Sequence, residues 1–186
     1  MTPKYDDSDM KVVGVLSSSP AVNAADEAAQ RWSQDQKNGN VAKARRAGAI
    51  LAGSVLADET FSSIDAVADE DLRRQRLFLA SFAVEVGFDA FLPNANLSQT
   101  AQNMFDQTIQ ITSPEWYDLL VKSSAFSFYY LGVRATRGQG ENAVGETFAT
   151  LCGAAGNKAC IKTGKKLYLS VLSQIKKLVD NLQFEQ

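Results

Sequence analysis

The sequence predicts an all-α protein, a single-domain bundle of seven or eight helices around a central aromatic-rich helix at about residues 114–136. Three observations predict this class. Apolar residues recur at helical spacing along most of the chain, whereas the period-two pattern of strands is nearly absent. Helix start and stop residues separate the apolar segments. Residues 126–131 (FSFYYL) would place apolar groups in nearly every direction around a helix, which is typical of a buried helix.

Residues 1–18 are predicted to be a disordered or extended lead-in, and residues 19–186 to be one helical domain. The first ten residues, MTPKYDDSDM, are polar and acidic and contain no apolar core of a signal peptide. The longest apolar stretch, residues 77–92, is interrupted by two carboxylates and is too short to cross a bilayer. We therefore expect a cytoplasmic protein with no membrane partner.

Two helices are expected before residue 60. Ser19 is expected to cap the first, and the turn at residues 38–39 (NG) to end it. The second covers about residues 41–57. It carries a seam of small residues, which predicts the close approach of another helix of the same chain: Ala44, Gly48 and Ala52.

The next helix is predicted at residues 69–91, because acidic residues fill its first turn and an LPN sequence follows its end. Its expected core face consists of Leu72, Leu79, Ala83, Val86 and Ala90. Ser98 is expected to cap a further helix that ends near residue 111.

The central helix has the clearest start signal in the chain. Ser113 is expected to cap it, Pro114 suits the first helical position, and Glu115 lies near the positive end of the helix dipole. A flexible link at residues 137–140 and a short helix at residues 141–152 follow.

Asn157 is expected to cap the last helix, which ends near residue 182. This helix is expected to dock into the core through one apolar stripe: Ile161, Tyr168, Leu172, Ile175, Val179 and Leu182. Its basic opposite face left a second interpretation open, that of a membrane-surface or partner-binding arm.

The absence of histidine removes the commonest general base, the commonest metal ligand and every Ser-His or Cys-His nucleophile pair. Cys152 and Cys160 cannot form a four-ligand zinc site by themselves. They are expected to be small, partly buried thiols, with a redox pair as the alternative. We therefore predict no catalytic residues, no metal site and no cofactor.

Glu85 and Asp89 stand four residues apart, which places both carboxylates on one helix face. Such a pair could hold a hard cation or act as acid and base. Because the same face continues through Ser81, Arg74 and Asp71, we interpret it as a solvated surface.

Arg73, Arg74 and Arg76 follow residues 62–67 (SSIDAV), which suggests a helix, a turn and a basic second helix. Over this short part of the chain the sequence resembles the TetR-like transcriptional regulators, a resemblance that would imply a helix-turn-helix DNA contact. The turn at residues 69–71 departs from that pattern, since it is acidic and contains no glycine. Nucleic acid is therefore not the expected partner. The glycines at 138, 140 and 145 lack the spacing of a phosphate-binding loop.

The expected function is non-catalytic, through an unknown protein partner or a homodimer. The alternative is a helical ligand-binding regulator, remotely TetR-like, with a pocket on the central helix. Tyr129 and Tyr130 would line that pocket, and Arg134 would anchor an anion.

Overall fold

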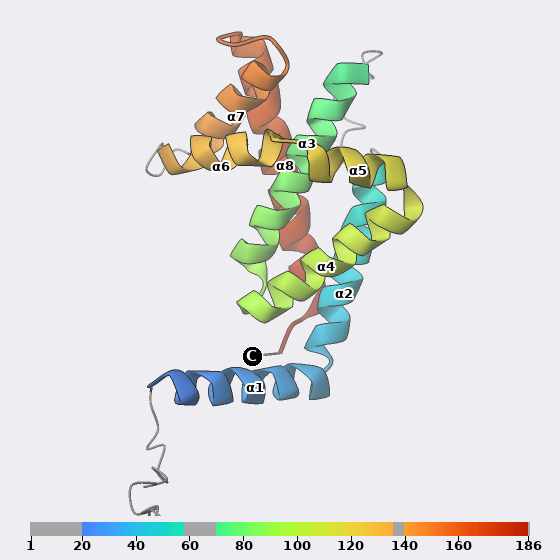
Figure 1. Ribbon diagram of the computed structural model, residues 1–186, viewed down its shortest axis with the longest axis vertical. Coiled ribbons are helices and arrows are strands. Elements are labelled where there is room, and N and C mark those ends of the chain that lie inside the picture. The colour runs from blue at the N-terminus through green and yellow to red at the C-terminus, as the bar shows by residue number, and fades with distance from the viewer. Residues whose placement is uncertain (1–19, 58–69, 136–139, 186) are drawn as a thin grey trace, which may run out of the picture.

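The computed structural model describes residues 20–57, 70–135 and 140–185, and the elements in these ranges are eight α-helices (Figure 1). They are α1 (Pro20–Lys37), α2 (Asn40–Leu56), α3 (Glu70–Phe91), α4 (Ala95–Thr112), α5 (Pro114–Lys122), α6 (Ala125–Ala135), α7 (Gly140–Leu151) and α8 (Lys158–Leu182). No strand occurs in these ranges, so the predicted all-α class is confirmed. The predicted lead-in at 1–18, the Ser19 cap, the turn at 62–67 and the link at 137–139 lie outside the described residues.

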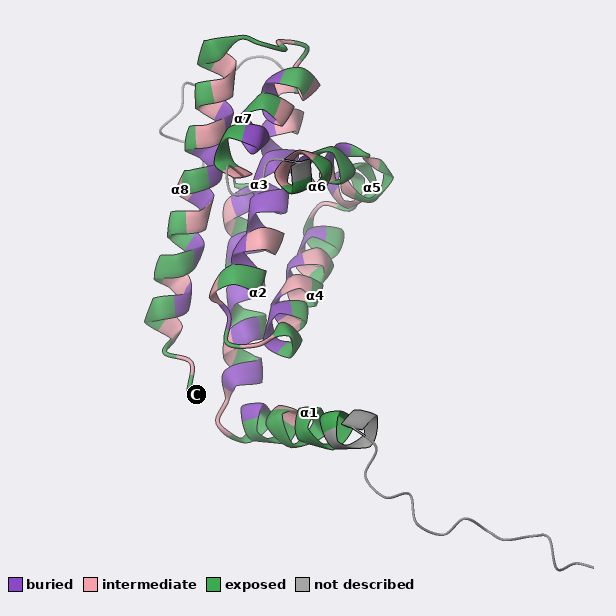
Figure 2. Ribbon diagram, turned by 90° about the vertical axis from the view of Figure 1, so that its left-hand side faces the viewer, coloured by how far each residue is buried: buried purple, intermediate pink, exposed green. Residues whose placement is uncertain are grey.

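Helix α3 runs through the middle of the bundle and packs against α2, α4, α6, α7 and α8. Half of its 22 residues are buried. Figure 2 colours the buried parts of the ribbon purple. Phe82 lies in the aromatic core, with the Tyr129 ring stacked on it at 5.0 Å and the Tyr130 ring edge-on at 5.1 Å. The predicted central position of residues 114–136 is therefore wrong. Residues 77–84 (LFLASFAV) carry no charge, so every face of α3 can be buried there.

The segment 114–136 forms two helices, α5 and α6, rather than one. Ser123 lies between them in an extended conformation (φ −78°, ψ 138°), and its hydroxyl accepts a hydrogen bond from the Ala125 N–H at 3.0 Å. A serine that bonds to nearby backbone competes with the helix, and Ser124 follows directly. The predicted start at Pro114 is confirmed, although the Ser113 side chain makes no capping hydrogen bond.

Neither α5 nor α6 is buried on all sides. Trp116 of α5 and Tyr129 of α6 are buried, whereas Phe128 is 51% exposed and Leu131 is 62% exposed. The apolar residues 126–131 therefore supply both an inner face, which packs on α3, and an outer face, which remains in solvent.

The small-residue seam of α2 packs against α4, as predicted. Ala44 and Ala52 are fully buried. A Cβ on Gly48 would collide with the Ala101 carbonyl oxygen and lie 2.9 Å from the Phe105 amide nitrogen. Glycine at this position allows the two helix backbones to touch.

Asn94, rather than Ser98, caps α4. Its backbone is extended, and its side-chain oxygen accepts a hydrogen bond from the Leu97 N–H at 3.0 Å. The helix therefore begins three residues before the predicted cap. Ser98 is buried and donates its hydroxyl hydrogen to the Asp89 carboxylate instead.

Helix α8 docks into the core, as predicted, and packs on α3 and α7. Of the predicted stripe, Tyr168, Ile175 and Val179 are buried, whereas Ile161, Leu172 and Leu182 are only half-buried. Leu167 and Val171, which were not part of the predicted stripe, are buried as well. The predicted cap is also confirmed, because the Asn157 side chain accepts hydrogen bonds from the N–H groups of Ala159 and Cys160.

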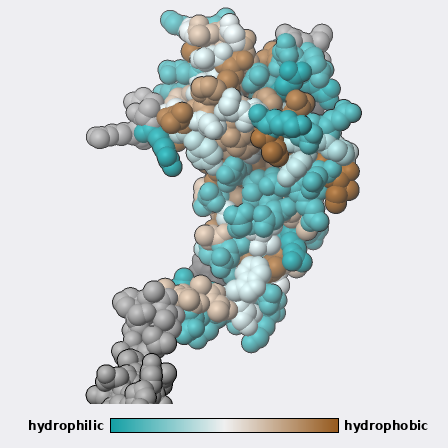
Figure 3. Space-filling view, viewed as in Figure 1, coloured by the Kyte–Doolittle hydropathy of each residue, from teal (hydrophilic) through white to brown (hydrophobic). Residues whose placement is uncertain are grey.

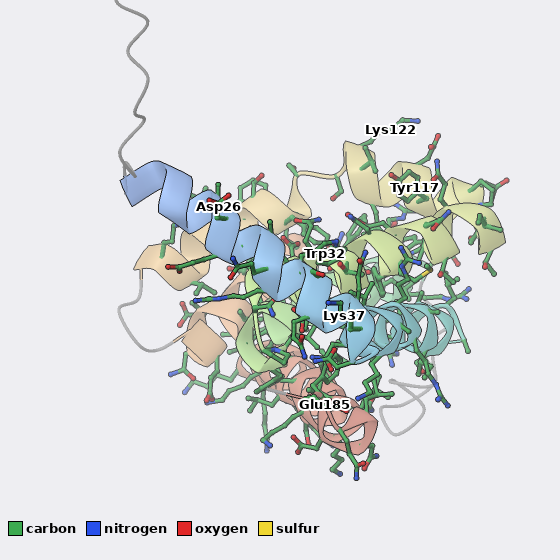
Figure 4. All side chains as sticks on the ribbon, turned by 90° about the horizontal axis from the view of Figure 1, so that it is seen from below. Asp26, Trp32, Lys37, Tyr117, Lys122 and Glu185 are labelled. Atoms are coloured by element: carbon green, nitrogen blue, oxygen red, sulfur yellow. The ribbon has the colours of Figure 1, made fainter. Side chains whose placement is uncertain are left out.

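Helix α1 crosses the lower end of the bundle, close to the C-terminal segment (Figure 1). A group of hydrogen-bonded polar side chains joins the two there. Asn40 is fully buried and donates to Asp35 at 2.8 Å and to the Glu185 carbonyl oxygen at 2.7 Å. The Glu185 N–H returns a bond to Asn40 at 3.0 Å, and Asn94 donates to the second Asp35 oxygen at 2.9 Å. Figure 4 views this corner from below, with Lys37 at the end of α1 and Glu185 labelled.

Candidate functional site

The three predicted ligand-binding residues lie on α6, but they do not share one face. Tyr129 is fully buried, and its hydroxyl has no hydrogen-bond partner within the described ranges. Burial raises the pKa of Tyr129 well above its ordinary value, and the nearby thiols of Cys152 and Cys160 add to the shift. Tyr129 therefore faces the core on the side of these thiols.

Tyr130 is half-buried and faces α3, where its hydroxyl donates a hydrogen bond to Glu85. Burial is the largest cause that raises the pKa of Tyr130, followed by this hydrogen bond and by the charges of Glu85 and Asp89. The exposed Arg134 acts in the opposite direction. Tyr130 thus lies near Glu85 and Arg134 lies near Tyr130, while Tyr129 faces the core.

A cavity of about 220 Å³, which we call the acceptor pocket, lies among α3, α4, α5 and α6 next to Glu85. It is lined by Ser81, Glu85, Gln102, Phe105, Asp106, Tyr117, Leu120, Val121 and Phe126. The bend between α5 and α6 lets both helices contribute to it. Figure 4 labels Tyr117, one of the residues that α5 contributes to the pocket together with Leu120 and Val121.

The facing helices α3 and α4 supply four polar side chains of the acceptor pocket, and α5 adds the phenol of Tyr117. Gln102 donates a hydrogen bond to Asp106 at 3.0 Å. The other atom of that amide, Gln102 Oε1, has no hydrogen-bond partner in the described part of the chain. The same holds for the hydroxyl of Ser81, a residue that is only 1% exposed.

Asp106 is held in an unfavourable environment for a carboxylate. Burial raises the pKa of Asp106 above its ordinary value of 3.8, and the charge of Glu85 raises it further. The hydrogen bond from Gln102 opposes both effects. Two carboxylates therefore repel each other across a partly buried cavity.

The interpretation of the Glu85–Asp89 face as a solvated surface is wrong for its middle. Asp71 and Asp89 are exposed, but Ser81 is buried and Glu85 is half-buried, because α4, α5 and α6 cover this part of α3. The error arose from treating the helix in isolation, since a polar stripe can also line a cavity.

Sequence reasoning missed Gln102 and Asp106. Their i, i+4 spacing was visible, and Phe105 stands directly before Asp106. A carboxylate inside an otherwise apolar run on α3 and a carboxylate directly after a core aromatic residue on α4 could together have indicated the cavity. The pairing of α3 with α4 through Glu85 and Asp106 is a tertiary contact, however, which the pattern of one helix does not reveal.

A second feature is an apolar groove between α6 and α7. We call it the α6–α7 groove; it has a volume of about 390 Å³ and is lined by Phe128, Gly132, Ala143, Glu146, Thr147, Thr150 and Leu151. Leu131 stands in solvent on the same helix as Phe128. Figure 3 shows hydrophobic surface gathered on the upper half of the molecule, at the level of α5, α6 and α7.

Cys152 and Cys160 are both half-buried and form no disulfide, which agrees with the predicted thiols. They stand at the end of α7 and in the first turn of α8. The alternative of a redox pair stays a prediction.

The three arginines at the start of α3, Arg73, Arg74 and Arg76, do not form one basic surface. Arg76 is buried, and Arg74 pairs with Asp71 at 3.2 Å. Helix α3 begins at Glu70 and continues into the core, so its first turns are part of the central helix of the bundle.

The residues in the described ranges contain no group of three or more histidine, cysteine, aspartate or glutamate side chains able to hold a metal ion. None of the helices described above combines the length and apolarity that a membrane crossing requires. Comparison of the chain with protein-family models, with curated proteins and with solved structures gave no match.

Proposed function

We propose that the protein acts without catalysis, as a homodimer formed through the α6–α7 groove. The observation that carries the proposal is the half-exposed Phe128 ring beside an apolar hollow of about 390 Å³. Large apolar side chains kept in water next to an apolar hollow are typical of interaction surfaces. The complete absence of histidine supports a non-catalytic role.

The shape of the groove suits a second copy of the same chain. In a two-fold dimer both subunits use the same surface, so that surface must carry both a protrusion and a hollow. Phe128 and Leu131 supply the protrusion. The small residues Gly132 and Ala143 leave the hollow, because they have little or no side chain to fill it.

The test is the dissociation constant of the dimer, measured by sedimentation velocity over a wide concentration range. We expect Leu131→Glu to abolish the dimer, because two buried carboxylates would meet the apolar groove. The matched control is Ile111→Glu, since Ile111 is 73% exposed but lies on α4. It should leave the dissociation constant unchanged.

A chain that stays monomeric at all concentrations would overturn the proposal. So would an equal effect of Ile111→Glu and Leu131→Glu.

Ligand binding, the alternative function, has independent support in the unpartnered Ser81 and Gln102 oxygens of the acceptor pocket. Unsatisfied buried polar atoms are rare in folded proteins and call for an explanation, such as a missing ligand. The pocket lies on α3 and α4 as much as on α5 and α6, and not on a helix at residues 114–136 alone.

A further inference from the structure

The charged groups of the acceptor pocket are all acidic. Glu85 and Asp106 line it, and its lining residues include no lysine or arginine. Glu85 already accepts a hydrogen bond from Tyr130, and Asp106 accepts one from Gln102. A carboxylate offers about four acceptor positions, so both retain room for a ligand that donates hydrogen bonds.

Two uncharged oxygens, those of the Ser81 hydroxyl and the Gln102 amide, add to the acceptor groups of Glu85 and Asp106. The Ser81 hydroxyl is almost completely buried, and Gln102 Oε1 is buried as an atom, yet neither has a hydrogen-bond partner in the ranges that the structure describes. The amide nitrogen of Gln102 is engaged by Asp106, which leaves the oxygen to accept. A ligand with several N–H donors would satisfy these atoms.

The remaining wall of the pocket is aromatic and aliphatic. Phe105, Tyr117 and Phe126 supply three rings, from α4, α5 and α6. Aromatic faces attract organic cations. By contrast, Mg²⁺ and Ca²⁺ are bound by about six or more oxygen ligands, water included. A wall of aromatic and aliphatic side chains offers no such oxygen atoms.

We propose that the acceptor pocket binds a small primary ammonium ion with an apolar body, such as an alkylamine or an arylalkylamine. The three N–H bonds of the ammonium group are shared among the oxygens of Ser81, Glu85, Asp106 and Gln102, and the apolar body lies against the rings. The volume of about 220 Å³ is below the range of about 300–1,000 Å³ that drug-sized ligands occupy, which limits the ligand to a small amine. A bound cation also relieves the repulsion between Glu85 and Asp106.

This inference does not depend on self-association, because the acceptor pocket and the α6–α7 groove share no lining residue. Leu131→Glu should therefore leave amine binding unchanged. Failure of one proposal can thus be distinguished from failure of the other.

The experiment is isothermal titration calorimetry of the full chain with 2-phenylethylamine at low ionic strength. Its neutral analogue 2-phenylethanol has the same ring and chain length but no charge. We expect saturable binding of the amine and at least about tenfold weaker binding of the alcohol, because charge-assisted hydrogen bonds are about twice as strong as neutral ones. Tetramethylammonium, a cation without N–H donors, should also bind more weakly than the amine.

Variants locate the site. Glu85→Gln keeps the shape of the side chain and should weaken amine binding by about tenfold or more. Ser81→Ala should weaken it several-fold. The matched control is Asp118→Asn on α5, which removes an exposed carboxylate that pairs with Lys122 at 2.8 Å. It should leave the affinity unchanged, and thermal unfolding of each variant confirms that it is folded.

Three results would overturn the proposal. The first is no amine binding at about 10 mM, a concentration that saturates even a millimolar site. The second is equal binding of the amine and the alcohol, which would indicate an apolar cavity only. The third is stabilisation by Mg²⁺ or Ca²⁺ that Glu85→Gln abolishes, which would indicate a metal site.

Discussion

Replacing Asn40 by alanine removes three side-chain hydrogen bonds at the corner where α1, α2 and the C-terminal segment meet. The bond to the Asp35 carboxylate contributes about 1.5–3 kcal/mol, as expected for a charged partner. The two bonds to the Glu185 backbone contribute about 0.5–1.5 kcal/mol each. Glu185 is exposed, so in the variant water can replace part of the free energy of the two bonds to its backbone. We therefore expect Asn40→Ala to lower the free energy of unfolding by about 2–4 kcal/mol.

Urea denaturation followed by far-UV circular dichroism measures this loss, which should appear as a lower midpoint at an unchanged slope. The matched control is Asn103→Ala, at an exposed position on α4 that accepts a hydrogen bond from Gln99. It should change stability by less than about 0.5 kcal/mol. Asn40→Asp should cost more than Asn40→Ala, because it places a second carboxylate beside Asp35. A loss below about 1 kcal/mol for Asn40→Ala would refute the reasoning.

Two further predictions concern α2 and the acceptor pocket. Gly48→Ala should lower the free energy of unfolding by about 1–3 kcal/mol, because the added Cβ overpacks the contact with α4. Gly53→Ala adds a Cβ with no atom within 4 Å, so it should raise the free energy of unfolding by up to about 1 kcal/mol through helix propensity. Urea denaturation measures both variants, and equal effects would contradict the packing argument. Asp106 has a folded-state pKa above 3.8, so its contribution to stability is complete below that pH and is lost as the pH rises through the folded-state value. Asp106→Asn should therefore match the parent protein at low pH and be the more stable of the two at neutral pH. A constant difference across the pH range would contradict this.

The helices themselves were largely predictable, because their signals are local. Pro114 begins α5, Asn157 caps α8, and the Gly48 seam packs against another helix, as their chemistry indicates. The break at Ser123 was missed because the aromatic residues after it suggested one continuous buried helix. The adjacent Ser123 and Ser124 favour a helix break as strongly as the aromatic residues favoured a continuous helix.

The candidate site was less predictable, because it depends on which helix faces meet. Glu85 was noted as a carboxylate inside an apolar run. Asp106, however, becomes part of the site only because α4 packs on α3 and brings its carboxylate near Glu85. Likewise, Tyr129 and Tyr130 are neighbours in sequence and face different surroundings, one towards the thiols and the other towards Glu85. A single sequence contains the residues of such a site but not their pairing.

The hydrogen bonds between Asn40 and Glu185 join residues that are 145 positions apart in the chain. Closing a loop of that length costs about 4 kcal/mol of chain entropy, so this contact is not expected to form before the helices between its ends have packed. The contact should form only after the folding transition state. A substitution of Asn40 should therefore accelerate unfolding and leave the refolding rate nearly unchanged. The contacts between α1, α2 and the C-terminal segment therefore determine how long the native state persists, rather than how fast it forms.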